Sequence, residues 1–79
     1  MPAVSARLAA ESDYRLASAE IATGAYQDLR VAVKRLERLL IDRGYEGTSD
    51  STALHARLAE AYRGLADQHA RWAGSTSAR

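Results

Sequence analysis

The sequence predicts an all-α fold, an antiparallel helical hairpin of two long helices that associates into an oligomer. Ala, Leu, Arg and Glu, which favour helices, dominate both flanks of a short polar segment at residues 44–52. Apolar residues recur at helical spacing on each side of that segment. A chain of 79 residues has room for one small domain with a marginal core. We therefore expect a single helical domain over residues 1–79 that a second copy or another partner would stabilise.

The segment before the bend, residues 3–43, is predicted as one long or broken helix. Its clearest apolar stripe consists of Ala22, Ala25, Leu29, Val33, Leu36 and Leu40. Two arrangements stay open for the first third of the chain. Either the chain breaks at Thr23 and Gly24 to give a three-helix bundle, or one continuous helix tolerates the glycine at a cost of about 1 kcal/mol. We favour the continuous helix, because Thr-Gly supplies little of a turn, and its exposed alanine-rich surface predicts oligomerisation.

Residues 44–52 read GYEGTSDST, and we interpret them mainly as the bend between two helices. Gly44 suits the left-handed conformation just past a helix that ends near Arg43. Ser51 or Thr52 can cap the following helix by accepting a backbone N–H.

The second helix is predicted over residues 53–73, with residues 74–79 as a flexible tail. Its apolar stripe faces that of the first helix at matching length, which predicts the hairpin. The expected core consists of Leu29, Val33, Leu36, Leu40, Leu54, Leu58, Leu65 and Trp72.

The bend also carries a short motif. Tyr45, Glu46 and Gly47 place an aromatic residue two positions before a glycine in a chain without cysteine. In this the chain resembles the helical-hairpin substrates of type VII secretion, whose bend carries Trp-x-Gly. The Tyr-x-x-x-Asp/Glu export signal is missing, since Ala66 stands four residues after Tyr62. The alternative is that Tyr45 packs over the end of the hairpin and Gly47 relieves the turn.

A second spacing concerns catalysis. Arg63 and His69 form an Arg-x5-His pair, which resembles the short motif of HEPN ribonucleases, where histidine handles protons and arginine stabilises phosphate charge. The two residues lie about 120° apart on a helix, so a solvated Arg63 and an interface His69 are the alternative. Neither His55 nor His69 has carboxylates at metal-ligand spacing, and no phosphate loop or nucleophile elbow occurs. We expect no enzyme, no catalytic residue, no metal and no cofactor.

Charge adds one local feature. Arg30, Lys34 and Arg38 recur every four residues and form a candidate anion-binding stripe. A formal net charge of +1 gives no general attraction for nucleic acid, so a nucleic-acid-binding role for this stripe is kept only as an alternative. No segment is apolar for long enough to span a bilayer, and the opening lacks the basic region of a signal peptide. We expect a cytoplasmic protein that does not bind membranes.

These patterns together favour a non-catalytic protein–protein interaction or assembly module, an adaptor or structural subunit that acts through apolar helix faces. The expected partners are further copies of the chain or a larger protein. The candidate interface residues are Tyr14, Leu16, Ile21 and Trp72. Trp72 is the best single anchor, because a large aromatic side chain near a chain end normally needs a surface to cover it.

Overall fold

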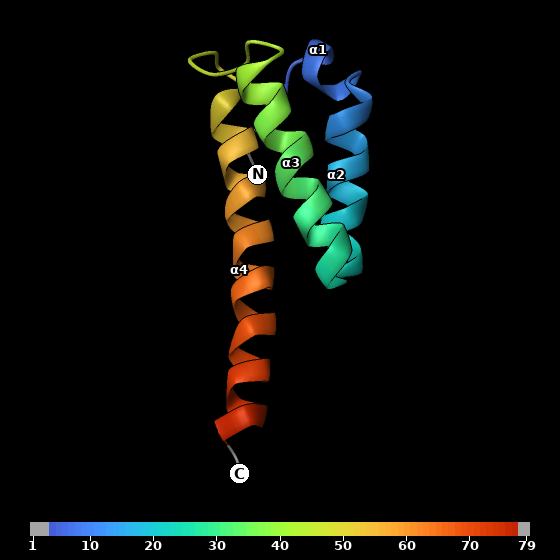
Figure 1. Ribbon diagram of the computed structural model, residues 1–79. Helices are drawn as coiled ribbons and strands as arrows, with labels where there is room; N and C mark the ends of the chain where they lie inside the picture. The colour runs from blue at the N-terminus through green and yellow to red at the C-terminus, as the bar shows by residue number, and fades with distance from the viewer. Residues whose placement is uncertain (1–3, 78–79) are drawn as a thin grey trace.

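The all-α prediction is confirmed by the computed structural model, which describes residues 4–77 and, up to residue 74, their side chains. Four helices pack against one another: α1 (Ala6–Ala9), α2 (Ser12–Thr23), α3 (Tyr26–Ile41) and α4 (Ser51–Ser77). Figure 1 shows α2, α3 and α4 running alternately down and up, with the short α1 at the bend end. No helix within the described residues is long and apolar enough to cross a membrane.

The first helix is broken at Gly24, so the favoured continuous helix is wrong. Gly24 adopts the left-handed conformation at φ 71°, and its N–H donates to the Ile21 carbonyl over 3.2 Å. The Thr23 hydroxyl oxygen accepts the Ala25 N–H at 3.2 Å and lies 2.7 Å from an Asp28 carboxylate oxygen. Glycine takes this conformation without the penalty that other residues meet, whereas inside a helix it costs about 1 kcal/mol. The Thr-Gly pair therefore makes a complete turn, and α2 folds back along α3.

The core lies mainly between α3 and its two neighbours. Leu29, Leu36, Leu40, Leu54 and Leu58 are buried as predicted. Ala61, on the predicted stripe of the second helix, is also buried. The core further holds residues outside the predicted stripes, namely Leu8, Ala17, Ala32, Leu39, Tyr45 and Ala53. Because α2 covers one side of α3 and α4 another, α3 buries a wider face than a two-helix hairpin requires.

Three members of the expected core are less buried than predicted, and Ala22 and Ala25 of the first stripe are exposed. Val33 is partly buried against the core, and Leu65 is intermediate. Trp72 is 47% exposed, so its assignment to the hairpin core is wrong. The reason is geometric. Because α3 and α4 are antiparallel, the start of α3 lies beside the later turns of α4, and Trp72 contacts Tyr26, the first residue of α3.

Backbone groups of the bend cap the end of α3. The N–H groups of Tyr45 and Glu46 donate to the carbonyls of Leu39 and Leu40 over 3.2 and 3.0 Å, which satisfies the end of α3. The Tyr45 side chain is fully buried, and Gly47 has φ 82°. The alternative in which Tyr45 packs over the hairpin end and Gly47 relieves the turn is therefore confirmed.

The N-terminal segment closes the bend end of the bundle. The Ser5 hydroxyl caps α1 by accepting the Leu8 N–H at 3.1 Å, and Leu8 is fully buried. Ser5 also donates its N–H and its hydroxyl to the two carboxylate oxygens of Asp50, at 2.9 and 2.5 Å. These hydrogen bonds lower the pKa of Asp50, the side-chain one contributing most. Residues 45 positions apart are thus joined at one end of the fold.

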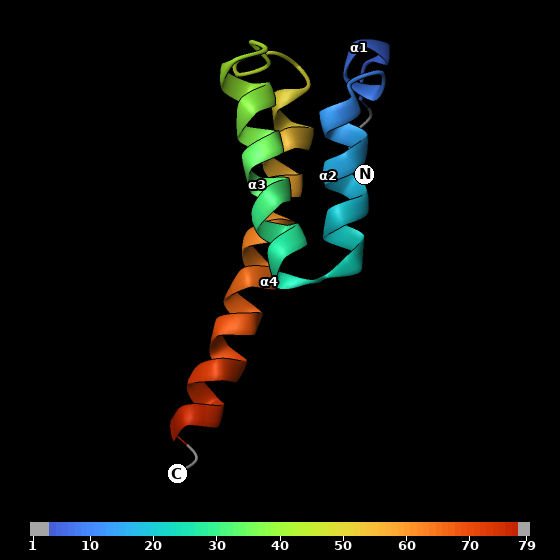
Figure 2. The same ribbon diagram turned by 45° about the vertical axis from the view of Figure 1, so that its right-hand side comes forward.

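The last helix extends past the others. It has 27 residues against 16 in α3, or about 40 Å against about 24 Å. We call the eleven additional residues, 67–77, the α4 overhang. Figures 1 and 2 show it continuing beyond the α2–α3 turn. The expected flexible tail from residue 74 is therefore helical up to Ser77, and residues 78–79 lie outside the described part.

Candidate interaction surface

Three aromatic side chains meet where the overhang begins. Tyr26, the first residue of α3, contacts His69 and Trp72 of α4 with ring centroids 5.6 and 5.0 Å apart, and His69 and Trp72 are 5.4 Å apart. All three pairs are edge-to-face, an arrangement worth about 0.5–1.5 kcal/mol per pair. We call Tyr26, His69 and Trp72 the aromatic cluster.

Helix geometry explains why these rings converge. Side chains on a helix point back towards its N-terminus. Tyr26 therefore reaches past the start of α3, while His69 and Trp72 on antiparallel α4 reach back towards the bundle. The interaction of the three rings fixes the lower part of α4 against α3.

The aromatic cluster is accessible and has a cationic edge. His69 and Trp72 are exposed, and Tyr26 is intermediate. One turn along α3, the Arg30 guanidinium carbon lies 5.7 Å from the centre of the Tyr26 ring, within reach of a cation–π interaction. Large rings beside an arginine combine the residue types that dominate binding energy at protein interfaces.

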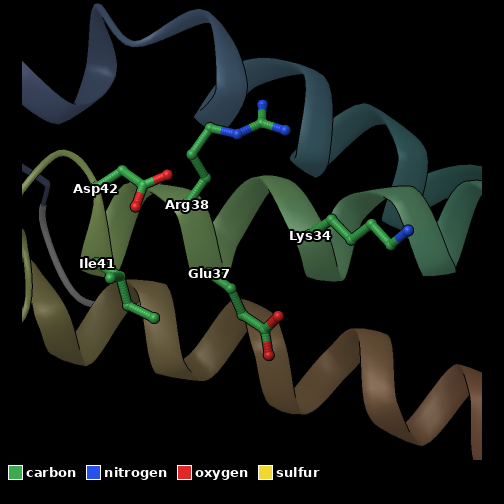
Figure 3. Close-up of a pocket in the computed structure, with 5 residues that line it drawn as sticks. All are labelled: Lys34, Glu37, Arg38, Ile41 and Asp42. Atoms are coloured by element: carbon green, nitrogen blue, oxygen red, sulfur yellow. The ribbon is translucent and has the colours of Figure 1, made fainter.

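The outer face of α3 continues this surface towards the bend. Ile41, which is 76% exposed, helps line a shallow hollow of about 250 Å³ together with Lys34, Glu37, Arg38 and Asp42. Figure 3 shows Glu37 and Ile41 leaning towards α4, Arg38 reaching towards α2 and Lys34 extended along α3. The Tyr62 hydroxyl of α4 donates to Glu37 at 3.1 Å. Partial burial and this hydrogen bond raise the pKa of Tyr62.

Acidic residues of α2 neutralise one end of the candidate anion-binding stripe. Arg38 pairs with Asp13 of α2 at 3.4 Å, and Asp13 also pairs with Arg35 at 3.3 Å. Arg35 forms a second pair with Glu20 at 3.0 Å, and this hydrogen bond is the main cause of its raised pKa. Within the described residues, Arg30 and Lys34 form no ion pair. The stripe therefore has two unneutralised cations, and its role in anion binding stays a prediction.

The four candidate interface residues do not form one surface. Tyr14 and Ile21 are partly buried against the chain's own core. Leu16 is 46% exposed on α2, beside a hollow of about 330 Å³ that it lines with Ser12 and Arg15. Trp72 lies on α4, with Tyr26 as its ring partner. Sequence reasoning missed Tyr26, although antiparallel pairing of the two helices places the start of α3 beside the later turns of α4.

At the bend end of the bundle, the polar side chains bind one another. The buried Tyr45 hydroxyl donates to Glu11 at 3.1 Å, and Arg43 pairs with the same carboxylate at 3.1 Å. The Arg7 guanidinium lies 4.2 Å from the Tyr45 ring centre and donates to the Arg43 carbonyl over 2.9 Å. Burial, followed by the bond to Glu11, raises the pKa of Tyr45. This network stabilises the closed end of the bundle.

The histidines of the chain lie apart from one another and from any group of metal ligands within the described residues. No three His, Asp or Glu side chains there gather closely enough to hold a metal ion. His69 belongs to the aromatic cluster, while Arg63 is exposed on another side of α4. His55 lies 3.2 Å from Glu46 at the bend.

No family model matches the sequence, and no curated protein or solved structure is significantly similar to it.

Proposed function

We propose that this chain is a non-catalytic helical interaction module, an adaptor or structural subunit that binds a helix of another protein chain along the lower part of α3 and α4. The observation that carries the proposal is the aromatic cluster. Its rings are held by two helices, and Trp72 is 47% exposed at the base of an overhang that extends past α2 and α3. A partner helix lying along α4 would contact both the aromatic cluster and the overhang.

Preorganisation supports this role. The edge-to-face contacts restrict the rings before any partner arrives, so little side-chain entropy remains to be lost on binding. Tyrosine, tryptophan and arginine are the residue types most enriched where binding energy concentrates, and Tyr26, Trp72 and Arg30 supply one of each. Exposed Ala66 and Ala70 leave room for a helix to approach α4 closely.

The alternatives have weaker support. A type VII secretion-like role would use the aromatic residue of the bend, and Tyr45 is fully buried there. A HEPN-like ribonuclease would need His69 beside Arg63 at a phosphate, whereas the His69 ring contacts Tyr26 and Trp72. Nucleic-acid binding would draw on a basic stripe in which Arg38 already pairs with Asp13.

Site-specific photo-crosslinking tests the proposal. A benzophenone amino acid replaces Ala70 on α4 or, as a matched control, Ala19 on α2, both of which are exposed. In cells of the organism that encodes the chain, we expect a protein adduct from position 70 that is absent from position 19 and is lost with Trp72→Ala. An adduct of twice the chain mass would identify a second copy as the partner. No adduct, or the same adducts from both positions, would overturn the proposal.

A further inference from the structure

Helix α4 carries a second line of residues at coiled-coil spacing, about 70° around the helix from its line of leucines. Tyr62, Ala66, His69 and Ala73 are separated by four, three and four residues and fall within about 60° of one another on the helix. All four are exposed. We call these four residues the outer seam. It is distinct from the line that begins with Leu54 and Leu58 and packs into the bundle.

The outer seam has cations on both sides. Arg63 lies about 100° around α4 from Tyr62, on one flank. On the other flank lies α3, because Tyr62 bonds to Glu37 and His69 contacts Tyr26.

One and two turns after the start of α3, Arg30 and Lys34 stand on that second flank. Within the described residues, Arg30, Lys34 and Arg63 are exposed and pair with no carboxylate. Arg35 and Arg57, in contrast, are paired at 3.0 and 2.9 Å. The seam is thus a band of rings and small side chains flanked by cations that form no ion pair in the described chain. Two carboxylates stand nearby, Glu37 on the α3 flank and Asp67 one turn after Arg63 on α4.

We propose that the outer seam is the docking site of an amphipathic helix from another protein, with acidic residues on both sides of its apolar stripe. The inference rests on the proposed function and specifies the partner that the module binds. Apolar residues of the incoming helix pack around Tyr62 and His69, and its carboxylates pair with Arg30, Lys34 and Arg63. Flanking charges of this kind select partners in coiled coils.

Charge also argues against two other occupants. A second copy that docked through the same seam would bring its own Arg63 and Arg30 towards this cationic surface, which opposes self-pairing. Single-stranded nucleic acid would find phosphate-binding cations, but Glu37 lies among them, and the three rings of the aromatic cluster present edges to one another. A helix with carboxylates only at its flanks fits the arrangement better.

Two synthetic peptides test the proposal. Each has about 21 residues in three heptads with apolar a and d positions and no tryptophan, and the flanking e and g positions are all Glu in one peptide and all Lys in the other. Trp72, the only tryptophan of the chain and the neighbour of Ala73, reports binding through its fluorescence. We expect the Glu peptide to bind about tenfold more tightly than the Lys peptide, with the difference shrinking as salt rises.

Charge reversal locates the site. Arg30→Glu combined with Arg63→Glu should weaken Glu-peptide binding about tenfold. The control Arg15→Glu makes one reversal on the outer side of α2 and should leave that binding unchanged. Equal affinity for both peptides, no binding of the Glu peptide, or tighter binding of an oligothymidine would overturn the inference. So would a dimer in sedimentation equilibrium that is dissociated by Ala66→Asp, since a second copy would then occupy the seam. If the residue at position 70 crosslinks to a protein but the Glu peptide does not bind, only the acidic character of the partner is refuted. If no crosslink forms at position 70, the proposed interaction module is refuted as well.

Discussion

Gly64 allows α4 to approach Leu29 closely, and replacing it by alanine should destabilise the fold. A Cβ atom at this position would lie 2.8 Å from Leu29 Cδ1 and 3.2 Å from Cδ2. The first distance is shorter than carbon atoms tolerate, so Leu29 has to move. It is only 2% exposed and packed in the core, which leaves its side chain little room to turn.

The sign of the effect follows from two opposing terms. In an unconstrained helix interior, Gly→Ala stabilises by about 1 kcal/mol. Forcing an additional methyl group into a packed core costs about 1–3 kcal/mol. Gly64→Ala should therefore lower the free energy of unfolding by about 1 kcal/mol. Gly74 is the matched control, because a Cβ there would meet no heavy atom within 4 Å, and Gly74→Ala should be neutral or stabilising.

Urea unfolding followed by far-UV circular dichroism measures both variants against the parent chain. A third comparison uses Leu29→Ala, which removes both atoms that the new methyl group would meet. In that background Gly64→Ala should stabilise by about 1 kcal/mol, so the pair should couple in a double-mutant cycle. If Gly64→Ala stabilises the parent chain as much as Gly74→Ala does, the close contact with Leu29 is wrong.

Three further predictions concern the turn, the bend and α2. Gly24→Ala should cost about 1 kcal/mol in urea unfolding, because its φ of 71° is strained for residues with a Cβ, and an unchanged midpoint would contradict the turn. The pKa of Asp50 is lowered from its ordinary 3.8 by Ser5, so this bond stabilises the fold above that pH, and the contribution is lost as pH falls through the folded-state value. Ser5→Ala should flatten the acid limb of the stability–pH curve below about pH 4, and an equally steep limb would refute the linkage. Leu16→Asp, at an exposed site, should change stability by less than about 0.5 kcal/mol, whereas Ile21→Asp should cost about 2 kcal/mol or more, and equal thermal midpoints would contradict this difference.

Local periodicity was enough to predict one helix that runs into the bend and another that leaves it. In both helices, leucines on one face are separated by four or seven residues, as in Leu29, Leu36 and Leu40 or in Leu54, Leu58 and Leu65. The glycines and short polar residues of the bend interrupt both patterns. The buried leucines of this pair, except Leu39, lie on the predicted stripes. The helix ends were placed within one or two residues at the bend, where Gly44 at φ 77° marks the chain reversal.

The break at Gly24 could not be decided locally, since the same Thr-Gly pair fits a turn or a helix interior. What decides it is burial gained far away in the sequence, where α2 places Ala17 in the core and packs Tyr14 and Ile21 against it. The same fold-back brings Asp13 beside Arg35 and Arg38. One non-local choice therefore accounts both for the burial of Ala17 and for the pairing of Arg38 with Asp13.

The proposed docking function rests most on how side chains are distributed around α4. Along the inner side, burial falls from Leu54 and Leu58, which are buried, through the intermediate Leu65 to the 47% exposed Trp72, as the other helices end. An outward face needed only for solubility would carry charged and polar side chains along its whole length. Here it carries Tyr62 and His69 at coiled-coil spacing, and the cations stand beside them. This arrangement supports the proposal that α4 binds a complementary helix, and the overhang extends the same face beyond the end of its own bundle (Figure 1).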